Sequence, residues 1–428
     1  MNSKYKRIGL LDHMGWGNMG DAAVQESVIW NIRKRLPSVE LIAFSLNPED
    51  TQERHHLVSY PITWSPPRQA ESATSGYCTP TLRARITASL KRCRPFYAVA
   101  KPIHDILREL AHLASSYRIV RSLDLLIISG GGQLSELWRG PWSHPYNVFK
   151  FCVLAKLART PVFIIGVGAG PLKHPLSKFF ARWSVCLADY KSFRDIESQL
   201  MVRNLGIRST TYVYPDPAYA LDMRDNFTMK PSHNSRPTIG LNPIGFCDPR
   251  IWPRHDGLAY VRYLDKLAAF SSWLLDQNYD VEVFTGEVSV DRYAMEDLRN
   301  RIAAHASKNG SAGITCVASL DLQKLLGQMS RFEFILTSKF HGVIFSHLLG
   351  KPVIALSYHR KIDDLMRNVG QSPYCLDISN FQVGELIKTF ELLADNTEHL
   401  MAQSHRIVVT YSRAVHKQFD NLFANQMS

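Results

Sequence analysis

Residues 334–361, FILTSKFHGVIFSHLLGKPVIALSYHRK, decide the fold of this chain. Phe334–Leu336 and Pro352–Leu356 are short apolar runs that are typical of buried strands. Between them, Val343, Ile344, His347 and Leu348 recur at helical spacing. The stretch therefore predicts a strand, a polar turn, a helix, a second strand and a second polar turn.

Of the charged or titratable side chains in the two polar turns of this stretch, we expect Lys339, His341 and Lys361 to share one crevice. In a unit of this kind the strand ends and the helix N-termini face one crevice. Two cations and a histidine beside a helix N-terminus suit a small anion, such as a phosphate or a carboxylate. The sequence therefore predicts an anion site in this crevice.

The rest of the chain repeats the alternation of strands and helices, which predicts parallel sheets covered by helices on both faces. The strands predicted in the first half are Arg7–Asp12, Val39–Phe44, Leu123–Ser129, Val162–Val167, Tyr190–Phe193 and Thr211–Tyr214. Those predicted in the second half are Thr238–Leu241, 280–284, 314–317, 333–336 and 352–356. The pattern predicts an α/β chain with two Rossmann-like, doubly wound domains.

A polar segment with two prolines, residues 225–237, separates the two series and is typical of a linker. We therefore expect an N-terminal domain over 1–224 and a C-terminal domain over 238–395. A helical segment over 396–428 follows. The length of 428 residues agrees with two domains.

Half of the net charge of +12 lies in residues 64–118, which hold nine Lys and Arg against three acids. One interpretation is a solvated, helical insertion in the N-terminal domain. The other is a surface for anionic lipid headgroups or an anionic acceptor. No nucleic-acid-binding motif is present, so we expect no nucleic acid partner.

The composition excludes several other classes of protein. No apolar run approaches the roughly 20 residues that span a bilayer, and the N-terminus lacks the apolar core of a signal peptide. The seven cysteines form no CxxC pair, and no metal-ligand spacing follows a strand. We therefore expect a cytoplasmic chain without a disulfide framework, a metal site or a cofactor.

A glycine-rich loop, Gly15–Asp21, follows the first strand and matches G-x-G-x-x-G. A dinucleotide site would also need an acid at the end of the second strand, which here ends in Ser45-Leu46-Asn47. The loop could instead bring the backbone of Gly17, Asn18 and Gly20 close to another ligand. Alternatively, it is a tight turn in which Asp21 caps the helix.

Three further strand ends carry candidate site residues. The run Ser129–Gly132 lets Gly131 and Gly132 approach a ligand closely, or forms a sharp turn. Arg194 precedes Asp195, a predicted helix N-cap, and could grip a carboxylate or phosphate or brace the loop. Asp216 lies between two prolines, where it could act as a base or hold Arg194 in place.

At these residues the chain resembles the polysaccharide pyruvyl transferase family over almost its whole length. The order and spacing of several segments carry the resemblance: Gly17–Asp21, Ser129–Gly132, Gly166–Pro171, Ser192–Asp195 with Ser198, Tyr214–Pro217, Gly240–Pro243, Ser338–His341 and Tyr358–Lys361. The resemblance implies a GT-B-like fold, in which two Rossmann-like domains face a cleft. It also implies transfer of a pyruvate ketal from phosphoenolpyruvate to a sugar of a cell-surface or exported polysaccharide.

The resemblance implies that Arg194, Lys339 and His341 hold the donor, with Lys361 as an addition and Ser338 beside them. Members of the family usually have arginine at the position of Lys339; lysine keeps the charge and loses the planar fork. The acceptor would be a polysaccharide or a lipid-linked oligosaccharide, reached from the N-terminal domain. A peripheral contact with anionic membrane would follow from residues 64–118.

The chemistry of this donor needs a general acid, a cationic clamp and a base. We expect His341 to be the acid, and Asp21 or Asp216 to be the base. Two alternatives stay open: a GT-B glycosyltransferase that uses a nucleotide sugar, and a non-catalytic member that binds a glycan. A carboxylate that grips ribose hydroxyls in the C-terminal crevice would favour the glycosyltransferase.

Overall fold

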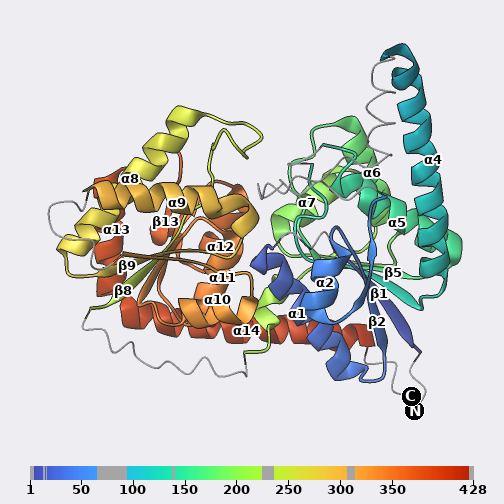
Figure 1. Ribbon diagram of the computed structural model, residues 1–428. Coiled ribbons are helices and arrows are strands. Elements are labelled where there is room, and N and C mark those ends of the chain that lie inside the picture. Colours follow the sequence, from blue (N-terminus) through green and yellow to red (C-terminus); the bar gives the residue numbers. More distant parts are fainter. Residues whose placement is uncertain are drawn as a thin grey trace.

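A computed structural model describes residues 4–12, 15, 17–64, 94–136, 140–223, 236–305 and 314–423. Its strands form two separate parallel sheets, one in each half of the chain (Figure 1). The predicted linker lies outside the described residues except for positions 236 and 237, as do residues 65–93 of the basic insertion. The two doubly wound, Rossmann-like domains expected from the sequence are confirmed.

The N-terminal sheet has the strand order β3-β2-β1-β4-β5-β6-β7. Its strands are β1 (Arg7–Leu11), β2 (Glu40–Ser45), β3 (Val58–Pro61), β4 (Leu125–Ser129), β5 (Val162–Val167), β6 (Tyr190–Phe193) and β7 (Tyr212–Val213). The accompanying helices are α1 (Met19–Arg35), α2 (Pro48–His55), α4 (Arg94–Arg121), α5 (His144–Ala158), α6 (Pro175–Leu187), α7 (Ile196–Asn204) and the short η1 (Pro217–Ala220).

The C-terminal sheet repeats this topology with the order β10-β9-β8-β11-β12-β13. Its strands are β8 (Thr238–Asn242), β9 (Asp280–Thr285), β10 (Ile314–Ala318), β11 (Phe334–Thr337), β12 (Val353–Ser357) and β13 (Cys375–Asp377). Its helices are α8 (Gly257–Asp276), α9 (Val288–His305), α10 (Leu322–Met329), α11 (Phe340–Leu348), α12 (Arg360–Asn368), η3 (Ser372–Tyr374), α13 (Val383–Asp395) and α14 (Thr397–Phe423).

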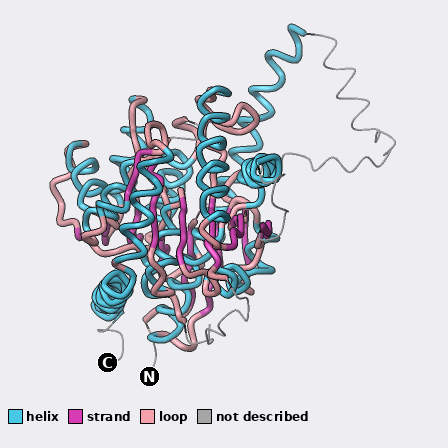
Figure 2. The backbone as a smooth tube through the Cα atoms, turned by 90° about the vertical axis from the view of Figure 1, so that its left-hand side faces the viewer, coloured by secondary structure: helices cyan, strands magenta, loops and turns pink. Residues whose placement is uncertain are grey.

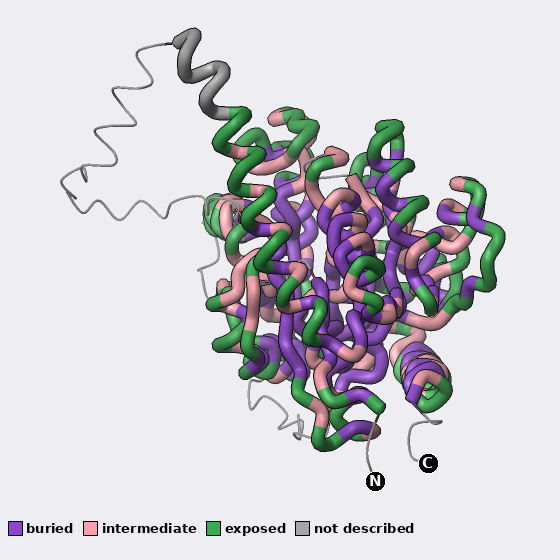
Figure 3. Tube along the Cα trace, turned by 90° about the vertical axis from the view of Figure 1, so that its right-hand side faces the viewer, coloured by how far each residue is buried: buried purple, intermediate pink, exposed green. Residues whose placement is uncertain are grey.

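Both sheets reverse their strand order once, between β1 and β4 in the first and between β8 and β11 in the second. In open parallel sheets, ligands bind in the crevice outside the carboxyl ends of the strands at such a reversal. The strands lie between layers of helices (Figure 2), and the buried residues are concentrated around them (Figure 3). The topology therefore marks one crevice in each domain.

The N-cap of α1 corrects one expectation from the sequence. Asn18, with φ −86° and ψ 108°, caps the helix, and its Oδ1 accepts from the backbone N–H of Gly20 at 2.9 Å. Asp21 therefore lies inside the first turn and does not cap it. Asp195 does cap α7 as expected, since it accepts from the N–H of Ser198 at 2.6 Å.

The last helix, α14, runs beneath both domains (Figure 1). Its end is fixed on α1, where Asp420 pairs with Arg35 at 2.6 Å and His416 Nδ1 lies 2.8 Å from Asn31 Oδ1. The Gln418 amide donates to Ser192 Oγ of β6 at 2.6 Å. The helix thereby ties the C-terminal half of the chain to the N-terminal sheet.

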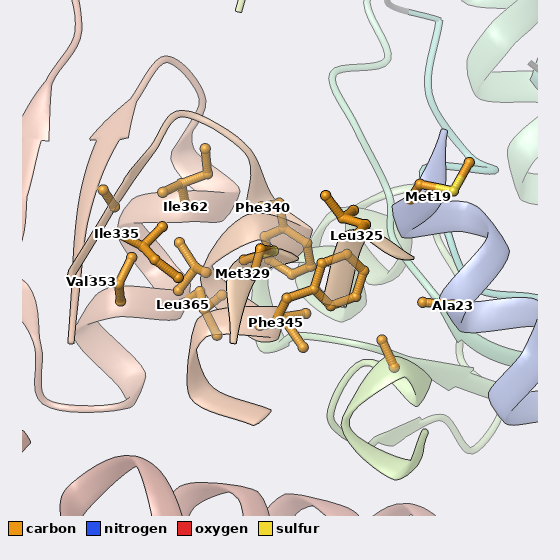
Figure 4. Packing of buried hydrophobic residues seen from close by; sticks show 14 of the residues in the cluster. Met19, Ala23, Leu325, Met329, Ile335, Phe340, Phe345, Val353, Ile362 and Leu365 are labelled. Carbon is orange, nitrogen blue, oxygen red and sulfur yellow. The ribbon is translucent and has the colours of Figure 1, made fainter. Parts of the chain in front are cut away.

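One apolar core continues from the N-terminal domain into the C-terminal domain. It joins Met19 and Ala23 of α1 to Leu325 of α10 and to Phe340 and Phe345 of α11 (Figure 4). A packed apolar contact of this kind restrains the relative motion of two domains. The crevices of the two sheets are therefore held face to face.

A close approach of the two domains depends on Gly20. A Cβ atom at this position would overlap the imidazole of His341, at the start of α11. We expect Gly20→Ala to destabilise the protein by about 1–3 kcal/mol, the usual cost of overpacking. Thermal unfolding followed by circular dichroism measures this change.

Gly384→Ala in α13 is the matched control, because its Cβ would meet no heavy atom within 4 Å. That variant should unfold at the wild-type temperature or slightly above it, since alanine is the better helix former. Equal unfolding temperatures for Gly20→Ala and Gly384→Ala would contradict the close approach at Gly20.

Candidate functional site

The candidate site is a cleft of about 1310 Å³ between the two domains. It lies where the strand order of each sheet reverses. The N-terminal wall includes Asn18, Gly20, Asp21, Gly132 and Arg194, and the C-terminal wall includes Glu287, Lys339, His341 and Lys361. Most of the residues predicted from the sequence therefore line one common cleft.

The start of α1 is joined by its backbone to the C-terminal domain. The N–H of Met19 donates to the carbonyl of Gly286 at 3.0 Å, and Asn18 forms an isolated bridge with Glu287. Asp21 then lies near His341. Burial raises the pKa of Asp21, and the nearby imidazole acts in the opposite direction.

The glycine run after β4 forms the turn beside Asp21. Gly130 and Gly131 have φ angles of 55° and 58°, which side chains other than glycine rarely adopt. A Cβ at Gly131 would lie 3.6 Å from Asp21 Oδ1, and Gly132 lines the cleft itself. The run is therefore both a sharp turn and a close approach to the cleft.

Asp216 joins a cation of one domain to the histidine of the other. Its Oδ2 lies 3.8 Å from Arg194 Nη1 and 3.7 Å from His341 Nε2, while its Oδ1 accepts from the N–H of Ala218 at 3.0 Å. Only 3% of Asp216 is exposed. Burial opposes its ionisation, but contacts with His341 and Arg194 prevail and lower the pKa of Asp216.

Two cations of the cleft lie over the Phe340 ring in cation–π contacts. The Arg194 guanidinium carbon lies 4.5 Å from the ring centroid, and Lys361 Nζ lies 5.7 Å from it. Arg194 also pairs with Asp195 at 3.2 Å. Among the described residues, no carboxylate oxygen lies within salt-bridge distance of Lys361 Nζ. Burial and the nearby Arg194 lower the pKa of Lys361 to about 8.

Lys339 is paired with two acids that the sequence analysis missed. Its Nζ contacts the carboxylate of Glu287, in the turn before α9, and the carboxylate of Asp291, in the first turn of α9. Burial opposes the charge of Lys339, but these two carboxylates raise its pKa, so the ammonium stays protonated. Glu287 follows the predicted strand 280–284, and its place at a strand end was the signal available in the sequence.

Four of the predicted residues do not line the cleft: Gly17, Gly131, Asp216 and Ser338. Gly131 and Asp216 lie behind its wall, beside residues that do line it. Ser338 is fully buried, and its hydroxyl lies 3.3 Å from the Tyr263 hydroxyl. Gly17 packs towards Leu320 instead. Within the described part of the chain, no group of three or more His, Cys, Asp or Glu side chains is arranged to hold a metal ion.

The fold resembles those of a UDP-GlcNAc 2-epimerase and a glycosyltransferase. A UDP-GlcNAc 2-epimerase from Methanocaldococcus jannaschii superposes with a TM-score of 0.56 and 10% identity, over 90% of this chain and 92% of that one. A glycosyltransferase from Rickettsia africae ESF-5 superposes with a TM-score of 0.56 and 8% identity, over 99% of this chain and 98% of that one. At such identities the likeness establishes the GT-B-like fold alone.

Sequence comparison gives the family. The amylovoran biosynthesis protein AmsJ of Erwinia amylovora is 22% identical over 303 residues, which cover 68% of this chain and 70% of AmsJ. The family described as polysaccharide pyruvyl transferase matches residues 18–360, from the N-cap of α1 to the start of α12. The match includes most of the cleft lining, although Lys361 and Asp364 lie just beyond its end. The chain belongs to the polysaccharide pyruvyl transferase family.

Proposed function

We propose that this protein transfers a pyruvate ketal from phosphoenolpyruvate to a sugar of a cell-surface or exported polysaccharide. Membership of the family supports a transferase in polysaccharide biosynthesis. The observation that carries the choice of donor is the pair of cations, Arg194 and Lys361, on the Phe340 ring. Phosphoenolpyruvate has two anionic groups for such a pair, and His341 follows Phe340 at the start of the same helix.

The proposed reaction has two additions to the same carbon. An acid protonates C3 of the enol, C2 gains oxocarbenium character, and a sugar hydroxyl attacks C2 and loses its proton to a base. The bond from C2 to the phosphate oxygen then breaks, and a second hydroxyl of the sugar attacks C2 and closes the ketal as its proton passes to the departing phosphate. Inorganic phosphate leaves with the electron pair of the broken bond.

The geometry supports a division of roles among the three candidates for acid and base. His341 is the proposed acid, since it lies in the cleft and the Asp216 carboxylate lies 3.7 Å from its Nε2. Asp216 is the proposed positioning residue for His341 and Arg194, because its lowered pKa suits a permanent anion. Asp21 is the proposed base, because burial raises its pKa and a carboxylate with a raised pKa is a stronger base.

One observation favours the rival donor, a nucleotide sugar. Glu287 lines the C-terminal crevice, where a carboxylate could hold ribose hydroxyls. This carboxylate is already paired with Lys339, so a sugar hydroxyl would have to compete with an ammonium. Calorimetry with phosphoenolpyruvate and with UDP- and GDP-sugars separates the two donors. Tight binding of a nucleotide sugar, with none of phosphoenolpyruvate, would reject the proposal.

His341→Gln should lower the turnover of pyruvyl transfer by about 10²–10⁴-fold, the usual cost of removing a general acid. Donor binding should change little, because the cations that hold the anion remain. Release of phosphate from phosphoenolpyruvate in the presence of acceptor measures turnover, and calorimetry measures binding. His399→Gln, on the exposed face of α14, is the control with unchanged turnover. Loss of donor binding with intact turnover would place His341 in the clamp instead.

Donor binding should weaken as Lys361 loses its proton. With a pKa of about 8, the ammonium is mostly present at pH 7 and mostly absent at pH 9. The dissociation constant of phosphoenolpyruvate should therefore rise about tenfold between pH 7 and pH 9, in proportion to the lost competent fraction. Lys361→Arg should remove this dependence, since a guanidinium stays protonated. A flat wild-type profile would contradict direct contact between Lys361 and the donor.

We propose in addition that α4 touches an anionic membrane, with the protein at the cytoplasmic face. Ile103, Ile106, Leu107 and Leu110 follow one helical stripe, and each is more than half exposed. Figure 1 shows α4 extending beyond the rest of the N-terminal domain. An apolar stripe in a basic segment suits the headgroup region of anionic lipid. No helix of the described residues has the length and apolar character to cross a bilayer.

Binding to vesicles of anionic phospholipid should fall steeply when salt increases from about 0.05 to 0.5 M, because such attraction is screened within about 10 Å at 0.1 M. Leu107→Ser should weaken it further. Leu157→Ser, at an equally exposed position of α5, should not. Equal binding to neutral and anionic vesicles, or binding to neither, would contradict the membrane contact and would favour a solvated, helical insertion.

A further inference from the structure

A second, smaller pocket of about 330 Å³ adjoins the cleft in the N-terminal domain. Trp142 and Asn147 line both hollows, so the pocket continues from the cleft. Its other walls include Trp64 and Tyr146, and Glu109 and Lys150 contribute charged groups. We call this hollow the Trp142 pocket. The roles proposed above for the cleft residues make no use of it.

Trp142 presents a large apolar ring to solvent in a fixed orientation. Its exposed fraction is 64%, although tryptophan is usually well buried. Two rings pack against it nearly edge-on, Tyr146 at 5.4 Å and Phe180 at 5.6 Å between centroids. The negative face of an aromatic ring attracts groups that carry partial positive charge. The C–H face of a pyranose is such a group, and it is flat enough to cover an indole.

The polar side of the pocket combines a buried lysine with a partly exposed carboxylate and a partly exposed tyrosine. Lys150 is 3% exposed, donates to the carbonyl of Ile62 at 2.8 Å and pairs with Glu109 Oε1 at 3.2 Å. The Tyr146 hydroxyl donates to the same oxygen at 2.8 Å. The charges of Lys150 and Glu109 therefore cancel locally, and the pocket has no net charge to attract an ion.

Two acceptors at the pocket lack a donor among the described residues. One is Asn147 Oδ1, in a side chain that is 2% exposed. The other is Glu109 Oε2, since the contacts of Glu109 from Tyr146 and Lys150 go to Oε1. The Asn147 acceptor is buried, and a buried acceptor without a partner is unfavourable. The Glu109 side chain is 22% exposed, so its Oε2 is open to solvent or to a ligand. A ligand with hydroxyl groups could donate a hydrogen bond to each of these two acceptors.

We infer that the Trp142 pocket binds an uncharged pyranose unit of the acceptor, beside the sugar that reacts in the cleft. The inference rests on the proposed function for the identity of the acceptor. The ring would stack its C–H face on Trp142 and donate hydroxyl hydrogens to Asn147 and Glu109. A neutral sugar has an apolar face that can cover the Trp142 ring, and it has hydroxyl donors for the two unpaired acceptors.

Saturation-transfer-difference NMR without any donor tests this binding directly. The probes are the methyl glycosides of glucose, galactose and mannose, each titrated into the whole protein. We expect at least one of them to bind, and Trp142→Ala to weaken it about fivefold to tenfold, the value of one aromatic contact. Trp183→Ala is the matched control, because Trp183 is also exposed, at 44%, but lines neither hollow.

Asn147→Leu provides a second variant that keeps the side-chain volume and removes the acceptor. It should weaken the same glycoside, and circular dichroism verifies that each variant is folded. If none of the three glycosides binds the wild-type protein, or if Trp142→Ala binds as the wild type does, the inference is wrong.

The outcomes for the pocket and for the proposed function are distinguishable. Pyruvyl transfer that persists while the pocket fails to bind sugar would overturn only the inference. Sugar binding that depends on Trp142, in a protein that does not use phosphoenolpyruvate, would overturn only the proposed donor. In the steady state, Trp142→Ala should raise the acceptor KM and leave the donor KM unchanged.

Discussion

The carboxylate of Asp216 is the constraint on which the site depends. It is almost completely buried, and it faces Arg194 of its own domain and His341 of the other. An unpaired buried charge is expensive, so each partner is needed to keep Asp216 ionised. The cleft therefore has a defined geometry only when the domains are together, which the shared apolar core and α14 enforce.

The strands and their ends could be predicted because a parallel sheet covered on both faces leaves continuous apolar runs. Val162–Val167 and Tyr190–Phe193 were located to the residue. Val58–Pro61 was missed because this edge strand is largely exposed and has no apolar run. Asp21 was given a capping role that Asn18 has, since both residue types cap helices and only the backbone distinguishes them.

Within the cleft, the sequence predicts the location of side chains at strand ends, but it does not predict contacts that form where two elements meet. Arg194 and His341 each follow a strand, and topology alone brings them to one cleft. The pairing of Lys339 with Asp291 joins a strand end to the first turn of a helix about fifty residues earlier. No spacing in the sequence encodes such a contact, because it depends on how α9 packs on its sheet.

The pairing of Lys339 with two carboxylates indicates a different role for this lysine from the donor contact expected from the sequence. A guanidinium could hold a carboxylate and still present free N–H groups to a donor anion, whereas an ammonium between two carboxylates has little capacity left. Lys339 therefore neutralises Glu287 and Asp291 in the crevice. If the donor is the anion proposed above, the cations left to contact it are Arg194 and Lys361. Of these two, Lys361 is the cation without a paired carboxylate among the described residues, so it has the most charge to offer an anion.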